Sequence, residues 1–138
     1  MTYPANIIRS EEDKVYEVDF PDLPGCLTYG ETMEEAKTYA AEALTGYLES
    51  VISREVDFKQ PSRIRKGMYS IEQEKPVAFV LWLRTKRKES GMTLKDAAEK
   101  LGVKYQVYQK LEDPAKTNPT LKTIDRLEHL FNERLVSV

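Results

Sequence analysis

Residues 20–36 read FPDLPGCLTYGETMEEA and contain three structural signals in succession. Two prolines and a glycine within residues 21–25 fix φ, remove backbone donors and admit a positive φ, so the chain must turn out of any preceding strand. The run over residues 26–29 predicts a short strand. Thr32, with Glu35 three residues later, is typical of a capping box and predicts the first turn of a helix.

Strands are expected before this stretch and a long helix after it. The runs over residues 3–9 and 15–20 are rich in β-branched and aromatic residues and flank a charged loop, which predicts a β-hairpin. A fourth strand is expected at residues 68–72. After the cap, apolar residues recur at the spacing of a helix that packs on a sheet: Ala36, Tyr39, Ala40, Ala43, Leu44, Tyr47, Leu48 and Val51. We therefore predict an α+β domain over residues 1–74, with a small antiparallel sheet and one main helix.

The composition is that of a soluble globular protein. The chain has 138 residues, of which 41% are hydrophobic and 32% charged, enough for one ordinary domain or two small ones. No apolar run approaches the length of about 18 residues needed to span a membrane, and no secretory signal is recognisable, so we expect a cytoplasmic protein. Cys26 and His129 are the only residues of their types, which excludes an internal disulfide and a cysteine-based zinc cluster. We expect no metal and no cofactor.

The formal net charge of −2 conceals an asymmetry along the chain. Residues 1–60 hold 5 Lys or Arg against 13 Asp or Glu, whereas residues 84–138 hold 12 against 8. An acidic half joined to a basic half predicts different partners for the two ends, with nucleic acid the natural partner of the basic one. On charge alone, a pair of solvated surfaces explains the asymmetry equally well.

Three carboxylates raise the alternative of a metal-dependent nuclease. Glu17, Asp19 and Asp22 lie close in sequence, and a two-metal site needs several carboxylates within a few ångströms. The sequence supplies no recognisable nucleophile, oxyanion donor or metal-ligand spacing beside them. A row of solvent-facing acids is the simpler interpretation, and we expect the protein not to be an enzyme.

One set of residues in the acidic half matches the signature of a known family: Phe20 to Cys26, Thr28, Gly30, Thr32, Glu35-Ala36 and Ala40 to Leu44. With these residues the chain resembles the HicB antitoxins. The resemblance implies a fold similar to a truncated ribonuclease H domain that has lost nuclease activity. It also implies a partner, the HicA toxin, which is a small basic ribonuclease that degrades messenger RNA and whose active histidine the antitoxin covers.

The charge of the acidic half suits such a partner, because an acidic surface complements a basic RNA-binding protein. If the similarity carries over, the toxin-facing surface includes Asp19, Asp22, Glu34 and Glu35. Ordinary exposed carboxylates explain the same four residues equally well.

The basic half predicts helices separated by short turns. Pro76 suits the start of one helix. Thr93, with Asp96 three residues on, predicts the capped start of the next, and Gly102 ends it. Residues 104–112 can start another helix at once, so two helices meet across a turn of about three residues, which is the spacing of a helix-turn-helix.

The expected helix-turn-helix has an apolar underside, formed by Val103, Tyr108 and Leu111. The opposite face presents side chains suited to DNA: Lys104, Tyr105, Gln106, Gln109 and Lys110. Gln can pair with adenine edges, and Lys can reach guanine or phosphate. A last amphipathic helix is expected to turn four apolar residues inward: Leu121, Ile124, Leu127 and Phe131.

A block within residues 92–131 matches a second family: Ala98, Leu101-Gly102-Val103, Leu111-Glu112 and Asn118 to Leu121. This block resembles the Xre/Cro family of phage-repressor-like DNA-binding domains. Leu94 stands where that family often has a phosphate-contacting Gln, which puts one backbone contact in doubt. The resemblance implies an all-α helix-turn-helix domain over residues 75–138 that binds operator double-stranded DNA as a homodimer or higher homo-oligomer. We expect residues 133–138 to form a strand that pairs with another subunit.

Together, the two resemblances predict an antitoxin that neutralises a HicA-type ribonuclease and represses its own operon. Three alternatives stay open: a stand-alone ligand-responsive transcriptional repressor, a residual nuclease, and a purely structural interaction module. For the basic half, the alternative is a helical dimerisation domain whose basic face is only solvated surface.

Overall fold

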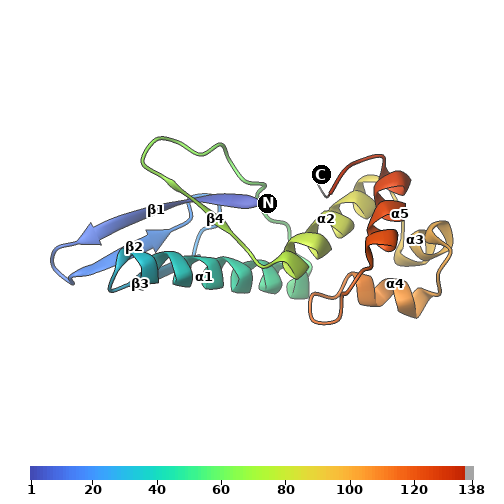
Figure 1. Cartoon of the computed structure of the whole chain (residues 1–138), viewed down its shortest axis with the longest axis horizontal. Coiled ribbons are helices and arrows are strands. Elements are labelled where there is room, and N and C mark those ends of the chain that lie inside the picture. Colours follow the sequence, from blue (N-terminus) through green and yellow to red (C-terminus); the bar gives the residue numbers. More distant parts are fainter. Residues whose placement is uncertain (136–138) are drawn as a thin grey trace. The chain divides into compact units, whose positions relative to one another are not determined.

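The computed structural model of the chain describes residues 1–135 (Figure 1). The chain forms two compact units, Met1–Glu74 and Lys75–Val138. Unit 1 carries a formal charge of −7, from 8 Lys or Arg and 15 Asp or Glu. Unit 2 carries a formal charge of +5, from 13 Lys or Arg and 8 Asp or Glu. In the described part of the chain, no helix combines the length and apolar character that crossing a membrane requires.

Unit 1 is built on a four-stranded antiparallel sheet in the order β3-β2-β1-β4. The strands are β1 (Thr2–Ser10), β2 (Val15–Asp19), β3 (Leu27–Gly30) and β4 (Tyr69–Glu72). The first half of β1 pairs with β4 and the second half with β2. The predicted hairpin, the third strand and the fourth strand are confirmed, and with them the α+β class of this unit.

Helix α1 (Met33–Arg54) packs along one face of this sheet (Figure 1). Its buried stripe repeats at helical spacing and is formed by Ala36, Ala40, Leu44, Thr45, Leu48, Val51 and Ile52. Tyr39 was expected in this stripe but is 40% exposed, so that expectation is wrong. Adjacent Ala40, also expected in the stripe, is 0% exposed. Neighbouring helical positions lie about 100° apart, so the two side chains point in different directions.

The start of α1 is capped by Thr32 as predicted, but only one of the two hydrogen bonds of a capping box is present. The Thr32 hydroxyl accepts a hydrogen bond from the Glu35 amide at 3.0 Å. The Glu35 carboxylate does not return to Thr32; it accepts the amide of Glu31 at 3.4 Å. Three residues therefore secure the turn between β3 and α1, and the reciprocal capping box predicted here does not form.

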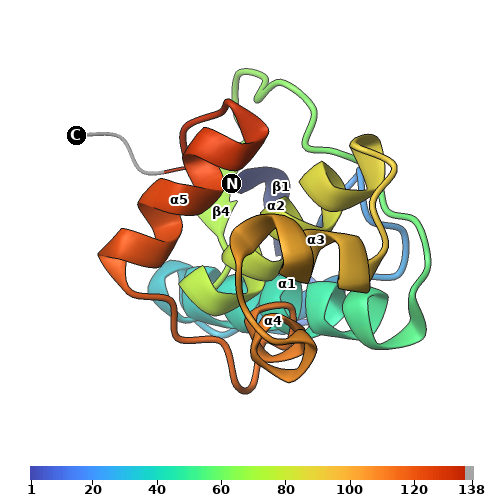
Figure 2. The same ribbon diagram turned by 90° about the vertical axis from the view of Figure 1, so that its right-hand side faces the viewer.

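Unit 2 contains four helices within its described residues: α2 (Lys75–Glu89), α3 (Leu94–Leu101), α4 (Tyr105–Leu111) and α5 (Leu121–Phe131) (Figure 2). The capping box between Thr93 and Asp96 is confirmed, with both hydrogen bonds present. Gly102 ends α3 in the left-handed conformation, at φ 76°, and α4 begins three residues later, at Tyr105. The sharp turn between α3 and α4 is therefore set by Gly102.

The packing of α5 differs from prediction at its first residue. Leu127 is fully buried, and Phe131 makes an edge-to-face contact with the Trp82 ring at 6.0 Å. Leu121, which was expected to point inward, is 80% exposed. At about 100° per residue, Leu121 lies roughly 90° around the helix from the stripe through Ile124, Leu127 and Phe131.

The predicted intermolecular strand at residues 133–138 lies partly outside the described residues. Residues 133–135 have no strand conformation, and residues 136–138 are not described. Asn132 ends α5 in the left-handed conformation, and the amide of Glu133 bonds to the Glu128 carbonyl.

Two glycines of unit 1 allow a direct test of the contact between β3 and α1. A Cβ on Gly30 would lie 2.4 Å from the backbone nitrogen of Ala36, whereas a Cβ on Gly46, within α1, meets no atom inside 4 Å. We predict that Gly30→Ala lowers the free energy of unfolding by about 1–3 kcal/mol, because the backbone cannot move aside cheaply. Gly46→Ala should raise it by about 0.5–1 kcal/mol through helix propensity.

Denaturant titration of the full chain, followed by circular dichroism, measures both changes. Equal effects of the two substitutions would contradict a close approach of β3 to the first turn of α1.

Candidate functional site

The sheet of unit 1 has one covered and one open face where β1, β2 and β3 pair. Directly paired residues of antiparallel strands point to the same face, and neighbours along a strand point to opposite faces. The row Ile7, Val18 and Thr28 faces α1, and Val18 is 2% exposed. The adjacent row, Ile8, Glu17 and Tyr29, lies on the opposite face.

The open face combines large apolar side chains with carboxylates. A second row there contains Asn6, Asp19 and Leu27. An open groove of about 780 Å³ runs over this face and is lined by Asp13, Val15, Glu17, Val18, Asp19, Leu27, Thr28 and Tyr29. Asp19, a predicted site residue, accepts a hydrogen bond from the Asn6 amide at 3.4 Å. No Lys or Arg is among the groove residues.

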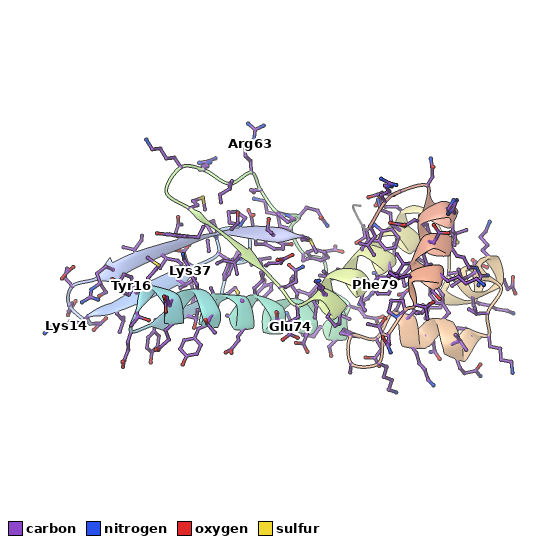
Figure 3. The ribbon with its side chains drawn as sticks, in the orientation of Figure 1. Lys14, Tyr16, Lys37, Arg63, Glu74 and Phe79 are labelled. Carbon is purple, nitrogen blue, oxygen red and sulfur yellow. The ribbon has the colours of Figure 1, made fainter. Side chains whose placement is uncertain are left out.

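Cations near this sheet contact aromatic rings. The Arg9 guanidinium lies 5.1 Å from the centre of the Tyr16 ring, and the Lys37 ammonium lies 5.0 Å from that of Tyr69. Arg9 and Tyr16 are directly paired across β1 and β2, in a row that faces α1. Figure 3 labels Tyr16 on β2 and Lys37 on α1. Among the described residues, Glu17 and Asp19 have no ion pair with any of these cations.

Asp22, the second predicted surface acid, is buried and only 5% exposed, so the expectation that it belongs to the open surface is wrong. Its carboxylate accepts the Ser62 hydroxyl at 2.6 Å and the Ser62 amide at 2.7 Å, and the Lys59 ammonium lies 2.9 Å away. Burial alone would raise the pKa of Asp22, but the bonds from Ser62 and Lys59 outweigh it and hold the pKa below its usual range. Asp22 therefore anchors the loop that precedes β4.

The remaining predicted acids, Glu34 and Glu35, lie in the first turn of α1. Glu34 is exposed, whereas Glu35 is partly covered and bonds to the Glu31 amide. Because α1 packs on the sheet face opposite to Asp19, the structure does not bring these residues together with Asp19. The four predicted acids occupy three separate places in unit 1.

The nuclease alternative needs Glu17, Asp19 and Asp22 to converge, and they do not. Asp22 is bound inside the loop, away from solvent, while the other two line the open face. Among residues 1–135, no group of three or more His, Cys, Asp or Glu is arranged to hold a metal ion.

Cys26 is 3% exposed, and burial raises the pKa of its thiol to about 11, so the thiol is protonated at neutral pH.

In unit 2, all five residues predicted to face DNA are exposed: Lys104, Tyr105, Gln106, Gln109 and Lys110. Four of them lie on α4, and Lys104 immediately precedes it. Tyr108 and Leu111 are buried on the other side of the helix, as predicted. The Gln109 amide donates to the Tyr105 hydroxyl at 3.3 Å, which places these two polar groups side by side on the exposed face.

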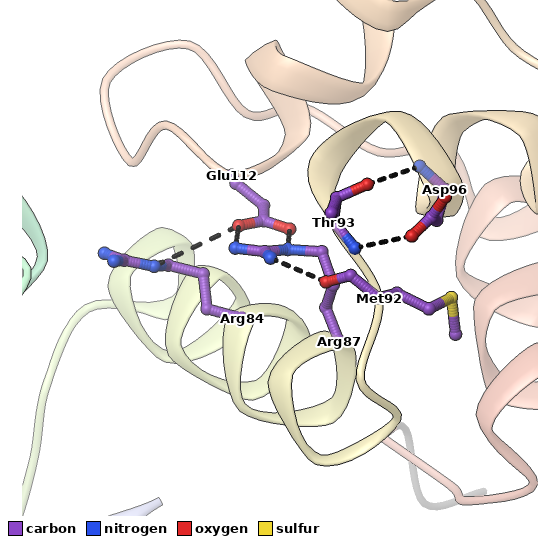
Figure 4. Close-up of polar contacts among 6 residues, drawn as sticks. All are labelled: Arg84, Arg87, Met92, Thr93, Asp96 and Glu112. Atoms are coloured by element: carbon purple, nitrogen blue, oxygen red, sulfur yellow. Dashed lines mark hydrogen bonds and ion pairs between the residues drawn. The ribbon is translucent and has the colours of Figure 1, made fainter.

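A charged pair holds the end of α4 against α2 (Figure 4). The Arg87 guanidinium donates from Nε to Glu112 at 2.7 Å and from Nη2 at 3.1 Å, and its Nη1 donates to the Met92 carbonyl at 3.0 Å. The side chains of Arg87 and Glu112 are 12% and 6% exposed, and Arg84 Nε lies 4.0 Å from the same carboxylate. A bidentate pair of this kind fixes orientation as well as distance. It therefore sets how α4 presents its exposed face.

Residues that the sequence analysis missed fall into two groups. The first group is Ile8, Leu27 and Tyr29. Strand alternation places them on one face of the sheet once the pairing of the strands is known, and the sequence analysis did not assign that pairing. The second group is Arg87 and Ser62, whose partners Glu112 and Asp22 lie 25 and 40 residues away in sequence. No local spacing rule connects such pairs.

The buried pair gives a prediction for unit 2. Glu112→Ala should lower the free energy of unfolding of this unit by about 3–5 kcal/mol, because it leaves the Arg87 charge buried without its carboxylate. Replacing both residues, as Arg87→Met with Glu112→Leu, should recover much of that loss. Trp82, the single tryptophan, provides the fluorescence signal for urea unfolding. A double variant less stable than Glu112→Ala would contradict this account.

Comparison with known proteins places the chain in a family. Residues 3–123 match the family described as "HicB_like antitoxin of bacterial toxin-antitoxin system". Antitoxin HicB 1 of Photorhabdus laumondii subsp. laumondii is 30% identical over 113 residues, which cover 82% of this chain and 71% of that protein. UPF0150 protein Ta0767 of Thermoplasma acidophilum is 47% identical over 45 residues, which cover 33% of this chain and 65% of that protein, just under two thirds of its length. The chain therefore belongs to the family of HicB-like antitoxins of bacterial toxin–antitoxin systems.

Proposed function

We propose that this protein neutralises a HicA-type messenger-RNA-degrading ribonuclease by binding it through unit 1 and covering its active site. In the same proposal, a dimer of the chain binds operator DNA through unit 2 and represses its own operon. The observation that carries the proposal is the family match, because it extends over residues 3–123 and so includes most of both units. Neither role is catalytic, and both place the protein in the cytoplasm, where its RNA-degrading partner and its operator are found.

The charge of unit 1 supports the toxin role. A ribonuclease must attract the RNA backbone with basic groups, and a unit of charge −7 attracts the same groups. The open sheet face and the first turn of α1 both expose carboxylates to such a partner. Asp22, being buried, takes no part in this attraction.

The arrangement of α3 and α4 supports the DNA role. Two short helices joined by a turn at Gly102, the second with a polar exposed face, match the demands of a helix-turn-helix. Gln106 and Gln109 can form paired hydrogen bonds with adenine, and Lys104 and Lys110 can reach phosphate or guanine. Two copies related by a dyad would address half-sites about 34–36 Å apart, so a palindromic operator is expected.

Separating the two roles tests the proposal. The full chain, added to the small basic ribonuclease encoded beside its gene, should inhibit RNA cleavage in proportion to the amount added. Gln106→Ala and Lys110→Ala should inhibit equally well, while each weakens binding to the operon's promoter DNA by about 5- to 150-fold, the loss expected for a base contact. RNA cleavage assays and gel shifts measure the two effects.

Lys88→Ala, which removes an exposed lysine from α2, is the matched control and should leave both readouts near wild type. Unchanged promoter affinity in both α4 variants would contradict the assignment of α4 to DNA. Absence of inhibition by the folded wild-type chain, with an active ribonuclease, would refute the antitoxin role and leave a stand-alone repressor responsive to another ligand.

A further inference from the structure

We propose that the toxin is held on the open face of β1, β2 and β3. Ile8 on β1 and Leu27 and Tyr29 on β3 are apolar anchors, and Glu17 and Asp19 on β2, with Asp13 in the preceding turn, form an acidic strip between them. This inference rests on the proposed antitoxin function and specifies the surface that performs it. The occupant is a protein surface that presents Lys and Arg between apolar side chains.

The register of the sheet places the three anchors on one face, on either side of the acids of β2. Ile8 pairs with Glu17, and Glu17 pairs with Tyr29, so these three side chains form one row across the strands. Leu27 is two residues from Tyr29 on β3 and therefore points to the same face. Side chains directly opposite each other lie about 4.5–5.5 Å apart at Cβ, close enough for one partner surface to cover them all.

These three side chains are largely exposed and lie on the same face of the sheet. Ile8, Leu27 and Tyr29 are 63%, 66% and 62% exposed, and α1 covers only the other face of the sheet. Single exposed apolar residues are common on protein surfaces, but several exposed apolar side chains gathered with polar ones on one face mark a contact site. Tyrosine, the type of the anchor on β3, is among the residue types that most often dominate binding.

The charges near the anchors indicate which class of partner this surface can bind. The groove that runs between them is lined by Asp13, Glu17 and Asp19, and no groove residue is basic. Such a surface repels an acidic or phosphate-bearing ligand and favours a cationic protein. A ribonuclease that binds the RNA backbone carries cations that can pair with this acidic strip.

The acids at the start of α1 form the rival surface. Glu34 and Glu35 lie on the helix that covers the opposite face of the sheet. Among residues 1–135, no group of exposed apolar side chains of comparable size lies on that helix beside them. Tyr39, 40% exposed, is the nearest large exposed side chain along that helix. The open sheet face therefore offers a basic partner both electrostatic attraction and apolar contact, whereas the start of α1 offers mainly electrostatic attraction.

The test compares matched variants of the full chain. Tyr29→Thr and Ile8→Thr remove anchors while keeping good strand residues, and Glu17→Lys reverses one charge of the acidic strip. Tyr39→Ala and Glu42→Lys make the corresponding changes on exposed positions of α1. The dissociation constant is measured by calorimetry with a catalytically inactive form of the ribonuclease encoded beside the gene, and thermal unfolding shows that each variant is folded.

Tyr29→Thr should weaken binding by about 30-fold, the loss typical of an interface hot spot. Glu17→Lys should weaken binding more at low salt than at high salt, because salt screens the lost attraction. The α1 variants should change the dissociation constant by no more than about twofold, as for surface residues outside a contact.

Wild-type affinity in both Tyr29→Thr and Ile8→Thr would overturn this assignment while leaving the antitoxin role intact. Loss of binding in Glu42→Lys with no loss in Glu17→Lys would move the site to α1 and also overturn it. Failure of the wild-type chain to bind the ribonuclease would instead refute the proposed function, and this inference with it.

Discussion

The contact between α1 and one face of the sheet is the interaction on which unit 1 depends. A sheet of four short strands is stable only if one face is buried, and the alanine and leucine stripe of α1 buries it. Ala36 and Ala40 are small enough for the helix to approach closely, and Gly30 allows β3 to lead directly into it. Because strand side chains alternate, the same contact leaves the other face, with Ile8, Leu27 and Tyr29, open. The fold and the proposed binding surface thus have one physical origin.

Unit 2 depends on a comparable constraint of a different kind. The exposed residues of α4 can present a defined surface only if the helix is held rigidly, and a helix of 7 residues is too short to be stable by itself. Its buried side chains, Tyr108 and Leu111, anchor one side, and the pair between Arg87 and Glu112 fixes its end. At the other end of the turn, Arg126 of α5 donates a hydrogen bond to the carbonyl of Leu101. Polar contacts between distant segments therefore determine how the exposed face is presented.

Local patterns predicted most elements of the fold, and distant contacts account for the errors. The strands, α1 and the cap at Thr93 follow from alternation, helical spacing and capping residues, all of which act over a few positions. Asp22 was misplaced because its partner, Ser62, lies 40 residues away and a carboxylate in a Pro-rich turn looks solvent-exposed in sequence. Leu121 was misplaced because its spacing from Ile124 suits a helical stripe, while the centre of that stripe is set by Leu127 and Phe131. The binding roles of the two units stay predictions.

In the proposed complex, the sheet face that the packing of α1 leaves open holds a basic ribonuclease. Hydrogen exchange of the full chain, measured with and without the inactive ribonuclease, reports on every segment at once and therefore locates the binding surface. We expect slower exchange in β2 and β3 when the ribonuclease is added, with the exchange of α4 unchanged. Protection confined to α4, or to α1 with none in β2 and β3, would rule out the open sheet face as the binding surface.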